Sequence, residues 1–210
     1  MSRLADHTLV VSRRCDYERR DAFCERAEAI GLEHWAFFDA IDAQKAKLST
    51  SVETLHGRHM RPAPQPLCTG ELGCLLSHLA IWRVFDCLDW KTLCVLEDDV
   101  EFVDVEKFWT RWRKFKRALP EDALMAHLAG EEVTRPEDVN KYVARVTHTY
   151  GTSAMLLTPK AVDLLTNHQD ADTMREPADW LLPGMFDTGR VYCPREPMFR
   201  HTNAPGIMPR

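Results

Sequence analysis

Apolar residues recur along this chain with two periodicities, one typical of helices and one typical of strands. His7–Ser12 is a short run rich in β-branched residues and predicts a strand. Residues 16–30 carry apolar side chains at helical spacing, and Gly31 directly afterwards favours the end of a helix. Because residues 33–38 predict a second strand, the start of the chain predicts a parallel strand–helix–strand unit.

Strands and helices continue to alternate further along the chain. A helix is predicted to begin at Thr69 as its N-cap, because leucines recur at helical spacing over residues 72–79. Further helices are predicted at residues 105–119 and 159–166, and further strands at residues 92–96, 124–128, 143–147 and 153–157. This alternation predicts an α/β fold with a mostly parallel sheet flanked by helices, in a single domain that covers residues 1–210.

Two stretches of the chain show neither periodicity. Residues 43–68 are rich in Ser, Thr and His and then in Pro, which predicts a mobile surface loop rather than a linker between domains. The tail from residue 183 holds many of the chain's 12 prolines. We therefore expect the tail to wrap the surface in an extended form.

Composition narrows the class of protein but says nothing about chemistry. At 45% hydrophobic and 28% charged residues, the 210-residue chain has the composition of an ordinary globular protein. It has no apolar run long enough for a transmembrane helix, and its N-terminus lacks a signal-peptide pattern. The net charge of −5 argues against a nucleic-acid binder. Seven irregularly spaced cysteines predict free thiols in a reducing compartment, so we expect a cytoplasmic protein.

Three adjacent carboxylates follow the apolar run TLCVL at residues 92–96: Glu97, Asp98 and Asp99. Ligands of open α/β sheets bind beyond the carboxyl ends of strands, where these side chains would lie. If the strand continues that far, Glu97 and Asp99 share one face and Asp98 takes the other. Like charges so close need a cation, and Mg²⁺ or Mn²⁺ bridged to phosphate oxygens would provide one. A solvated loop after the strand is an equally good reading of the triplet alone.

Two motifs stand in order around this triplet, PLCTGELGCLLSH at residues 66–78 and VLEDDV at residues 95–100. With Trp82 between them, they resemble glycosyltransferase family 25, the lipopolysaccharide-type sugar transferases that are also related to collagen galactosyltransferases. The resemblance covers most of the chain and includes FFDAID at residues 37–42, GTSAMLLTPKA at residues 151–161 and PAD at residues 177–179. Either of the first two motifs alone would be weak, but their combination is specific.

The resemblance implies a GT-A fold, a nucleotide-sugar donor that is commonly UDP-galactose, and an inverting single displacement. It also implies that Asp99, the last carboxylate of the triplet, binds Mn²⁺ or Mg²⁺. Glu97 and Asp98 would then lie near the ribose or hold metal-bound water. The metal would stabilise the charge that develops on the departing UDP.

Residues near the first two strands are candidates for the rest of the donor. Ser12 is followed directly by two arginines, whereas the family usually has an apolar residue before a basic one. Arg14 or Arg20 could meet the pyrophosphate, and the sequence leaves open which one does. Asp39 and Asp42 end the second predicted strand, where hydrogen bonds could read a uridine.

The predicted helix from Thr69 contributes two further candidates, Ser77 and His78. The resemblance suggests that they lie under the nucleotide. A buried histidine with a structural hydrogen bond is the alternative for His78. His201 in the tail could cap the metal, as tail histidines do in some GT-A enzymes.

An inverting transferase also needs a general base for the acceptor hydroxyl. Asp179 matches the family's Pro-x-Asp position and is the predicted base. An N-cap or first-turn aspartate for a short helix at residues 180–182 is the competing interpretation. Glu131 and Glu132 are weaker rivals for the base.

Residues 107–117 (KFWTRWRKFKR) hold six basic residues and no acidic one. One interpretation is a surface helix that attracts anionic lipid and presents Phe108, Trp112 and Phe115 to the interface, which would place the protein peripherally on the inner membrane face. The other is a helix that packs on the sheet with a solvated basic face. Binding of a polyanion, such as a phosphorylated acceptor, is a third possibility.

The sequence as a whole predicts a metal-dependent inverting glycosyltransferase. It would move a hexose, with galactose expected, from a UDP-sugar to a saccharide acceptor of a surface glycolipid, lipooligosaccharide or capsule. A phosphohydrolase with a strand-end acidic site is one alternative, although Glu97 stands where its attacking aspartate would be. A non-catalytic module that binds nucleotide sugars is the other.

Overall fold

A computed structural model describes residues 2–48, 67–129, 137–149, 151–167 and 177–201. Most of the predicted loop at residues 43–68 lies outside these ranges. The strands are β1 His7–Ser12, β2 Trp35–Asp39, β3 Leu93–Glu97, β4 Val100–Phe102, β5 Met125–His127, β6 Glu137–Asp138, β7 Val143–Arg145, β8 Ala154–Leu157, β9 Val191–Pro194 and β10 Phe199–His201. The α-helices are α1 Tyr17–Ala29, α2 Thr69–Asp86, α3 Phe108–Ala118, α4 Pro159–Asn167 and α5 Pro183–Phe186, with 3₁₀ turns at Val105–Lys107 and Ala178–Leu181.

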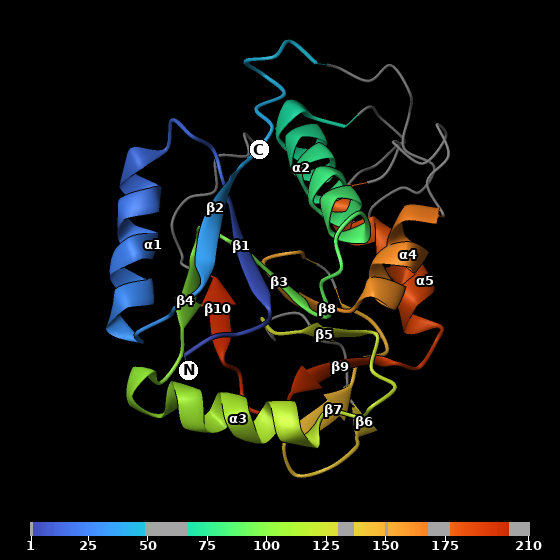
Figure 1. Cartoon of the computed structure of the whole chain (residues 1–210). Helices are drawn as coiled ribbons and strands as arrows, with labels where there is room; N and C mark the ends of the chain where they lie inside the picture. Colours follow the sequence, from blue (N-terminus) through green and yellow to red (C-terminus); the bar gives the residue numbers. More distant parts are fainter. Residues whose placement is uncertain (1, 49–66, 130–136, 150, 168–176, 202–210) are drawn as a thin grey trace.

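The described strands form one large sheet and one small one (Figure 1). The large sheet has eight strands in the order β2-β1-β3-β8-β5-β9-β7-β6, and β4 pairs with β10 in the small one. The pairs β1–β2, β1–β3 and β5–β9 are parallel, whereas β8 and β7 are antiparallel to their neighbours. All strands of the large sheet other than β7 and β8 therefore run the same way, which confirms the mostly parallel α/β sheet.

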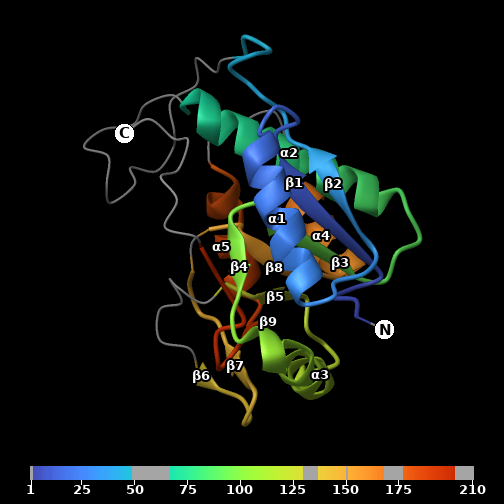
Figure 2. The ribbon, with the colours of Figure 1, turned by 90° about the vertical axis from the view of Figure 1, so that its left-hand side faces the viewer.

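Helices cover both faces of the large sheet, and two apolar clusters form the core between them. In β3, Leu93 and Val95 face the cluster under α2, α4 and α5, whereas Cys94 and Leu96 face the cluster under α1 and α3. Figure 2 shows α1 in front of the strands of the sheet and α2 behind these strands. A strand buried on both faces needs apolar residues at every position, which explains the continuous run at residues 92–96.

Capping interactions fix the ends of two helices. Gly31 has a positive φ of 62° and donates its N–H to Glu28 O, while the Leu32 N–H bonds to Ala27 O, which together form a Schellman motif. The predicted end of α1 is thus confirmed. The start of α2 differs from prediction, because Cys68 rather than Thr69 is the N-cap. Its Sγ accepts the N–H of Glu71, and the Glu71 carboxylate accepts the N–H of Cys68.

The aromatic residues of α3 lie in the core. Phe108, Trp112 and Phe115 are at most 3% exposed and pack against the sheet. The interpretation that presents these rings to a membrane is therefore wrong, since sheet contact already covers them. The basic side chains lie on the other faces of α3, with Arg113, Lys114 and Arg117 exposed. Among the described helices, none combines the length and the apolar character needed to cross a bilayer.

The tail from residue 183 does not wrap the surface as predicted. It forms α5, then β9 between β5 and β7 inside the large sheet, and then β10 beside β4. Val191, Tyr192 and Cys193 are buried, so their apolar character outweighs the effect of Pro194, which is the last residue of the strand. All seven cysteines are free thiols, as the sequence predicts.

The segment after β2 lies close against α2 because residue 73 has no side chain. A Cβ atom at Gly73 would stand 2.6 Å from Ile41 O. One turn later, the Ser77 hydroxyl accepts the N–H of Ile41 at 2.8 Å and donates to Gly73 O at 2.6 Å. Gly73 and Ser77 together therefore fix the backbone that follows β2.

Gly73→Ala is expected to lower the free energy of unfolding by about 2 kcal/mol, because the new methyl group must push the Ile41 carbonyl away. Urea unfolding followed by circular dichroism measures this loss. Gly184→Ala is the matched control, since a Cβ atom there meets nothing within 4 Å. Equal stability of the two variants would contradict the close approach.

Candidate functional site

The carboxyl ends of β1, β2 and β3 meet at one edge of the sheet. Register pairs Ser12 with Asp39 and Val11 with Glu97, so the acidic triplet begins beside the end of β1. Two backbone bonds extend this edge, from Ala40 N–H to Ser12 O and from Asp98 N–H to Val11 O. This is the place where parallel α/β sheets bind ligands.

The acidic triplet divides between the two faces of the sheet. β3 ends at Glu97, and the chain turns at Asp98 and Asp99 before β4. Glu97 extends towards α2, whereas Asp98 and Asp99 both meet Arg19 of α1. The predicted shared face of Glu97 and Asp99 required the strand to continue, and the turn prevents it.

Two arginines of α1 hold the turn of the triplet. Arg19 donates through Nε to Asp98 Oδ1 at 2.8 Å, and its Nη2 contacts the same oxygen and Asp99 Oδ2 at 3.1 Å. Arg26 donates to the Asp98 carbonyl at 2.6 Å. Burial raises the pKa of the Asp98 carboxyl, and Ser12 and Arg19 offset this only in part. Neither arginine is among the site residues predicted from the sequence, although the two lie seven residues apart and flank the buried Phe23 on α1.

Asp99 faces a histidine from the other end of the chain. β10 pairs with β4 so that His201 lies opposite Val100, which brings His201 Nδ1 to 3.6 Å from Asp99 Oδ1. Burial acts to raise the pKa of Asp99, but His201 and Arg19 outweigh it and hold the pKa below its usual value. The Oδ1 atom is buried and has no hydrogen-bond partner among the described residues.

This pair fits a divalent metal ion. Two neighbouring ligands of an octahedral ion with bonds of about 2.1 Å lie roughly 3 Å apart, a little closer than the two atoms are here. A carboxylate oxygen with an imidazole nitrogen suits Mn²⁺, and the oxygen suits Mg²⁺. Arg19, on the other oxygen of Asp99, would share that carboxylate with the ion.

The two arginines predicted for the pyrophosphate lie in different surroundings. Arg20 donates to Ser12 O at 2.8 Å and to Asp39 Oδ1 at 2.5 Å. Arg14 is exposed and makes no ion pair with the part of the chain that the structure describes. Arg20 therefore fixes the edge between β1 and β2, whereas the Arg14 guanidinium is open to solvent.

The loop between β1 and α1 forms one side of a hollow. Arg13 holds both oxygens of Asp16, at 2.8 and 2.9 Å, and approaches Asp42 Oδ2 at 3.5 Å. Asp42 also accepts the N–H of Lys45. A hollow of about 460 Å³ lined by residues 15–19 opens at this end of α1. Its volume is within the range of small-molecule sites.

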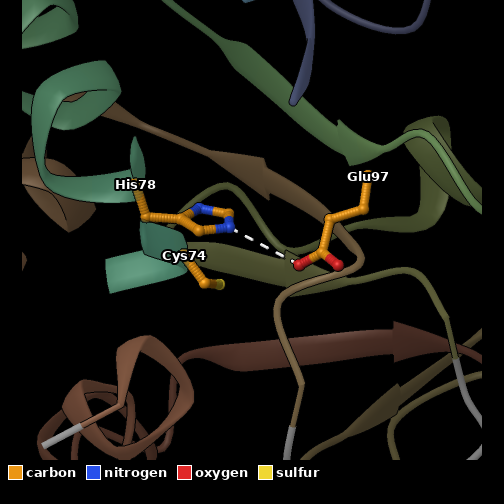
Figure 3. A group of neighbouring side chains, drawn as sticks. All are labelled: Cys74, His78 and Glu97. Atoms are coloured by element: carbon orange, nitrogen blue, oxygen red, sulfur yellow. Dashed lines mark ion pairs between the residues drawn. The ribbon is translucent and has the colours of Figure 1, made fainter. Parts of the chain in front are cut away.

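Glu97 forms a group with Cys74 and His78, of which His78 is buried and the other two are half-buried (Figure 3). His78 Nε2 lies 3.5 Å from Glu97 Oε1, which also accepts the Thr152 hydroxyl at 2.7 Å. Burial acts to raise the pKa of Glu97, but His78 outweighs it and the pKa is lowered. The side-chain ligand atoms of Cys74, His78 and Glu97 lie within 4.8 Å of one another, close enough for a metal ion. However, burial strongly raises the pKa of the Cys74 thiol, and a protonated thiol is a weak ligand.

The structure also places Ser77 and Asp179. Ser77 is fully buried, and its hydroxyl bonds to Ile41 and Gly73. Asp179 is half-buried in the first turn of the 3₁₀ helix Ala178–Leu181, where Pro177 rather than Asp179 is the N-cap. Its charge, like that of Glu97, acts to raise the pKa of the Cys74 thiol, so it lies near this end of the sheet. The rival bases Glu131 and Glu132 lie outside the described residues.

Solved structures share this fold. A glycosyltransferase involved in the glycosylation of the major capsid of PBCV-1 superposes with a TM-score of 0.51 at 8% identity, covering 95% of this chain and 94% of that one. At so low an identity the likeness concerns the fold alone. It agrees with the GT-A architecture that the sequence predicts.

Sequence comparisons identify the family. A "Glycosyltransferase 25 family member" of Anopheles gambiae is 28% identical over 81% of this chain. The "Probable inactive glycosyltransferase 25 family member 3" of Rattus norvegicus is 30% identical over 71%. The matches cover 30% and 27% of those proteins, so this chain corresponds to less than a third of each. The family model described as glycosyltransferase family 25 (LPS biosynthesis protein) matches residues 5–171, and the chain belongs to this family.

Proposed function

We propose that this chain is a metal-dependent inverting transferase that moves a hexose from a UDP-sugar to a saccharide acceptor. Galactose is the sugar we expect, and a surface glycolipid, lipooligosaccharide or capsule is the expected acceptor. The observation that carries the proposal is the pair of Asp99 and His201 at the carboxyl edge of a GT-A sheet. A buried carboxylate oxygen of Asp99 faces the imidazole of His201 there, beside a hollow at the start of α1.

Each residue of this edge has a part in the proposal. Asp99 and His201 would hold Mn²⁺ or Mg²⁺, which when bound supplies a Lewis acid for the charge on the departing UDP. Arg14, open to solvent near the hollow, would bind the pyrophosphate. The remaining expected donor contacts are Asp39, Asp42, Glu97 and Asp98. Ser77 and His78 would support the donor site indirectly. Ser77 would fix the Ile41 backbone, and His78 would orient the Glu97 side chain.

A donor panel tests this function. UDP release is measured from UDP-galactose, UDP-glucose and UDP-N-acetylglucosamine, with Mn²⁺ and with EDTA. We expect release from one of the three that depends on Mn²⁺, with UDP-galactose fastest. Equal release with EDTA would contradict metal dependence, and faster release from another donor would replace galactose.

Asp179→Asn is expected to lower sugar transfer at least about 100-fold and to leave UDP binding unchanged, because general-base catalysis contributes about 10²–10⁴-fold. Transfer to an acceptor and calorimetric binding of UDP measure the two effects separately. Asp187→Asn is the control, because Asp187 is an exposed aspartate that follows the short helix α5. Transfer at the normal rate by Asp179→Asn would remove it as the base.

A non-catalytic binding module is the second candidate, because a rat relative is named as a probable inactive member of the family. In that case UDP with Mn²⁺ would raise the melting temperature, but no donor in the panel would be hydrolysed. This result would retain the metal site and reject the transferase activity.

A further inference from the structure

A second hollow lies at the opposite edge of the sheet from the acidic triplet. It is lined by residues 3–6, which precede β1, by Thr92, which precedes β3, and by part of α3, and its volume is about 440 Å³. Figure 1 shows the start of the chain beside α3, away from the carboxyl end of β1. The proposed transfer reaction does not involve this edge.

Four cationic side chains line this hollow. They are Arg3, Arg113, Lys116 and Arg117. Within the described ranges, none of the four makes an ion pair, although Arg113 donates to the Thr110 hydroxyl at 3.5 Å. The carboxylate that lines the hollow, Asp6, accepts the N–H of Thr92 at 3.0 Å and its hydroxyl at 3.1 Å. The hollow is therefore strongly positive on a chain whose net charge is −5.

Lys116 is the cation that most needs a counter-ion. It is half-buried, its Nζ lies 5.9 Å from the centre of the Trp112 ring, and burial lowers the pKa of its ammonium group. A cation withdrawn from water is unfavourable unless an opposite charge compensates it. The charge of Asp6 acts to raise the pKa of Lys116, but the Asp6 carboxylate already accepts hydrogen bonds from Thr92. An anion in the hollow would compensate Lys116 directly.

The helix dipole explains only part of this arrangement. Lys116 and Arg117 lie in the last turn of α3, where cations are favourable in any helix. The dipole accounts neither for Arg113, one turn earlier, nor for Arg3, which comes from a different segment. What the four side chains share is the hollow that they line.

We propose that this hollow binds a phosphate group. Phosphate offers several acceptor oxygens to arginine and lysine donors that converge from two segments, and such charge-assisted bonds are the strong ones. The half-exposed Trp109 beside them provides a flat apolar surface for whatever carries the phosphate. The phosphate can belong to a soluble compound or to a lipid headgroup. The site is independent of the proposed transferase activity.

Two double variants with the same change of charge test the site. Lys116→Gln/Arg117→Gln removes two cations from the hollow. Lys114→Gln/Lys141→Gln removes two exposed cations that both lie near the Tyr142 ring and not in the hollow. Melting temperatures confirm that both variants fold.

Binding is measured with two probes. Calorimetry with inorganic pyrophosphate uses EDTA, so that no metal carries the probe to the acidic triplet, and flotation uses vesicles of phosphatidylglycerol with phosphatidylcholine. We expect the hollow variant to bind at least one probe about tenfold more weakly, and the control variant to bind it as wild type does. Weaker binding of pyrophosphate by the hollow variant shows that a soluble phosphate is sufficient. Weaker binding of vesicles alone identifies the lipid headgroup as the ligand. Equal loss in both variants, or no binding of either probe by wild type, would overturn the proposal.

Discussion

Asp99→Ala is expected to abolish the Mn²⁺-dependent binding of UDP. Asp99 contributes the buried Oδ1 atom that faces His201 and has no hydrogen-bond partner among the described residues. Loss of a group that only supports a metal ligand costs about 10–100-fold in metal affinity, so loss of the ligand itself should cost at least about 100-fold. Calorimetric titration of UDP with Mn²⁺ and with EDTA measures the metal-dependent part directly.

Asp89→Ala is the matched control for this experiment. Asp89 also lies near an end of β3, but it is exposed to solvent, precedes the strand and lies at the other edge of the sheet. It should bind UDP as wild type does. If Asp99→Ala keeps its Mn²⁺-dependent affinity, the metal assignment fails, while the fold and the family membership are unaffected.

Arg19→Met is expected to lower the free energy of unfolding by about 2 kcal/mol at neutral pH. The Asp98 side chain is 6% exposed, and Arg19 supplies its cationic partner. Breaking a buried ion pair costs about 3–5 kcal/mol, and the partial exposure of Arg19 reduces that figure here. Methionine keeps much of the length of the side chain, so the loss reports the charge. Urea unfolding measures it.

The destabilisation of Arg19→Met should shrink as the pH falls. Burial already raises the pKa of Asp98, and removal of Arg19 raises it further. An acid whose pKa is higher in the folded state takes up a proton on folding, so the variant gains stability as the pH falls through that raised pKa. Unfolding at neutral pH and at about pH 5 tests this direction.

Arg14→Met provides the control for this pH series. Arg14 is exposed and has no ion pair in the described ranges, so its loss should change stability by no more than about 0.5 kcal/mol at either pH. If Arg19→Met lowers the free energy of unfolding by the same amount at both pH values, the lost interaction is not with an ionised Asp98.

The sequence predicts most of the elements but not the direction of every strand. The apolar runs of β3 and β8 indicate strands buried on both faces, and the structure confirms both. A doubly buried strand has the same apolar pattern in either direction, so the reversal of β8 leaves no trace in its residues. The prediction for the tail is wrong for a different reason, because its prolines, of which Pro194 is the last residue of β9, hide a short apolar strand that only the sheet makes stable.

The site could be predicted as far as it depends on neighbouring residues. The end of β3 fixes where the acidic triplet lies, and the pattern of residues 92–99 contains that information. The partners of the triplet come from far along the chain. Arg19 reaches Asp98 only because α1 packs beside β3, and His201 reaches Asp99 only because β10 pairs with β4. Such contacts depend on packing and pairing that no local pattern encodes.

The pairing of β4 with β10 also has a consequence for the order in which the molecule can assemble. β1, β2 and β3, which bring the acidic triplet to its edge, are all complete by Glu97. β8 must then enter between β3 and β5, and β10 follows every other described strand. On a ribosome, the carboxylates of the triplet are therefore made long before His201, and the two can meet only after residue 201 has emerged. A nascent chain would therefore bring His201 to Asp99 only after all eight described strands of the large sheet have been synthesised.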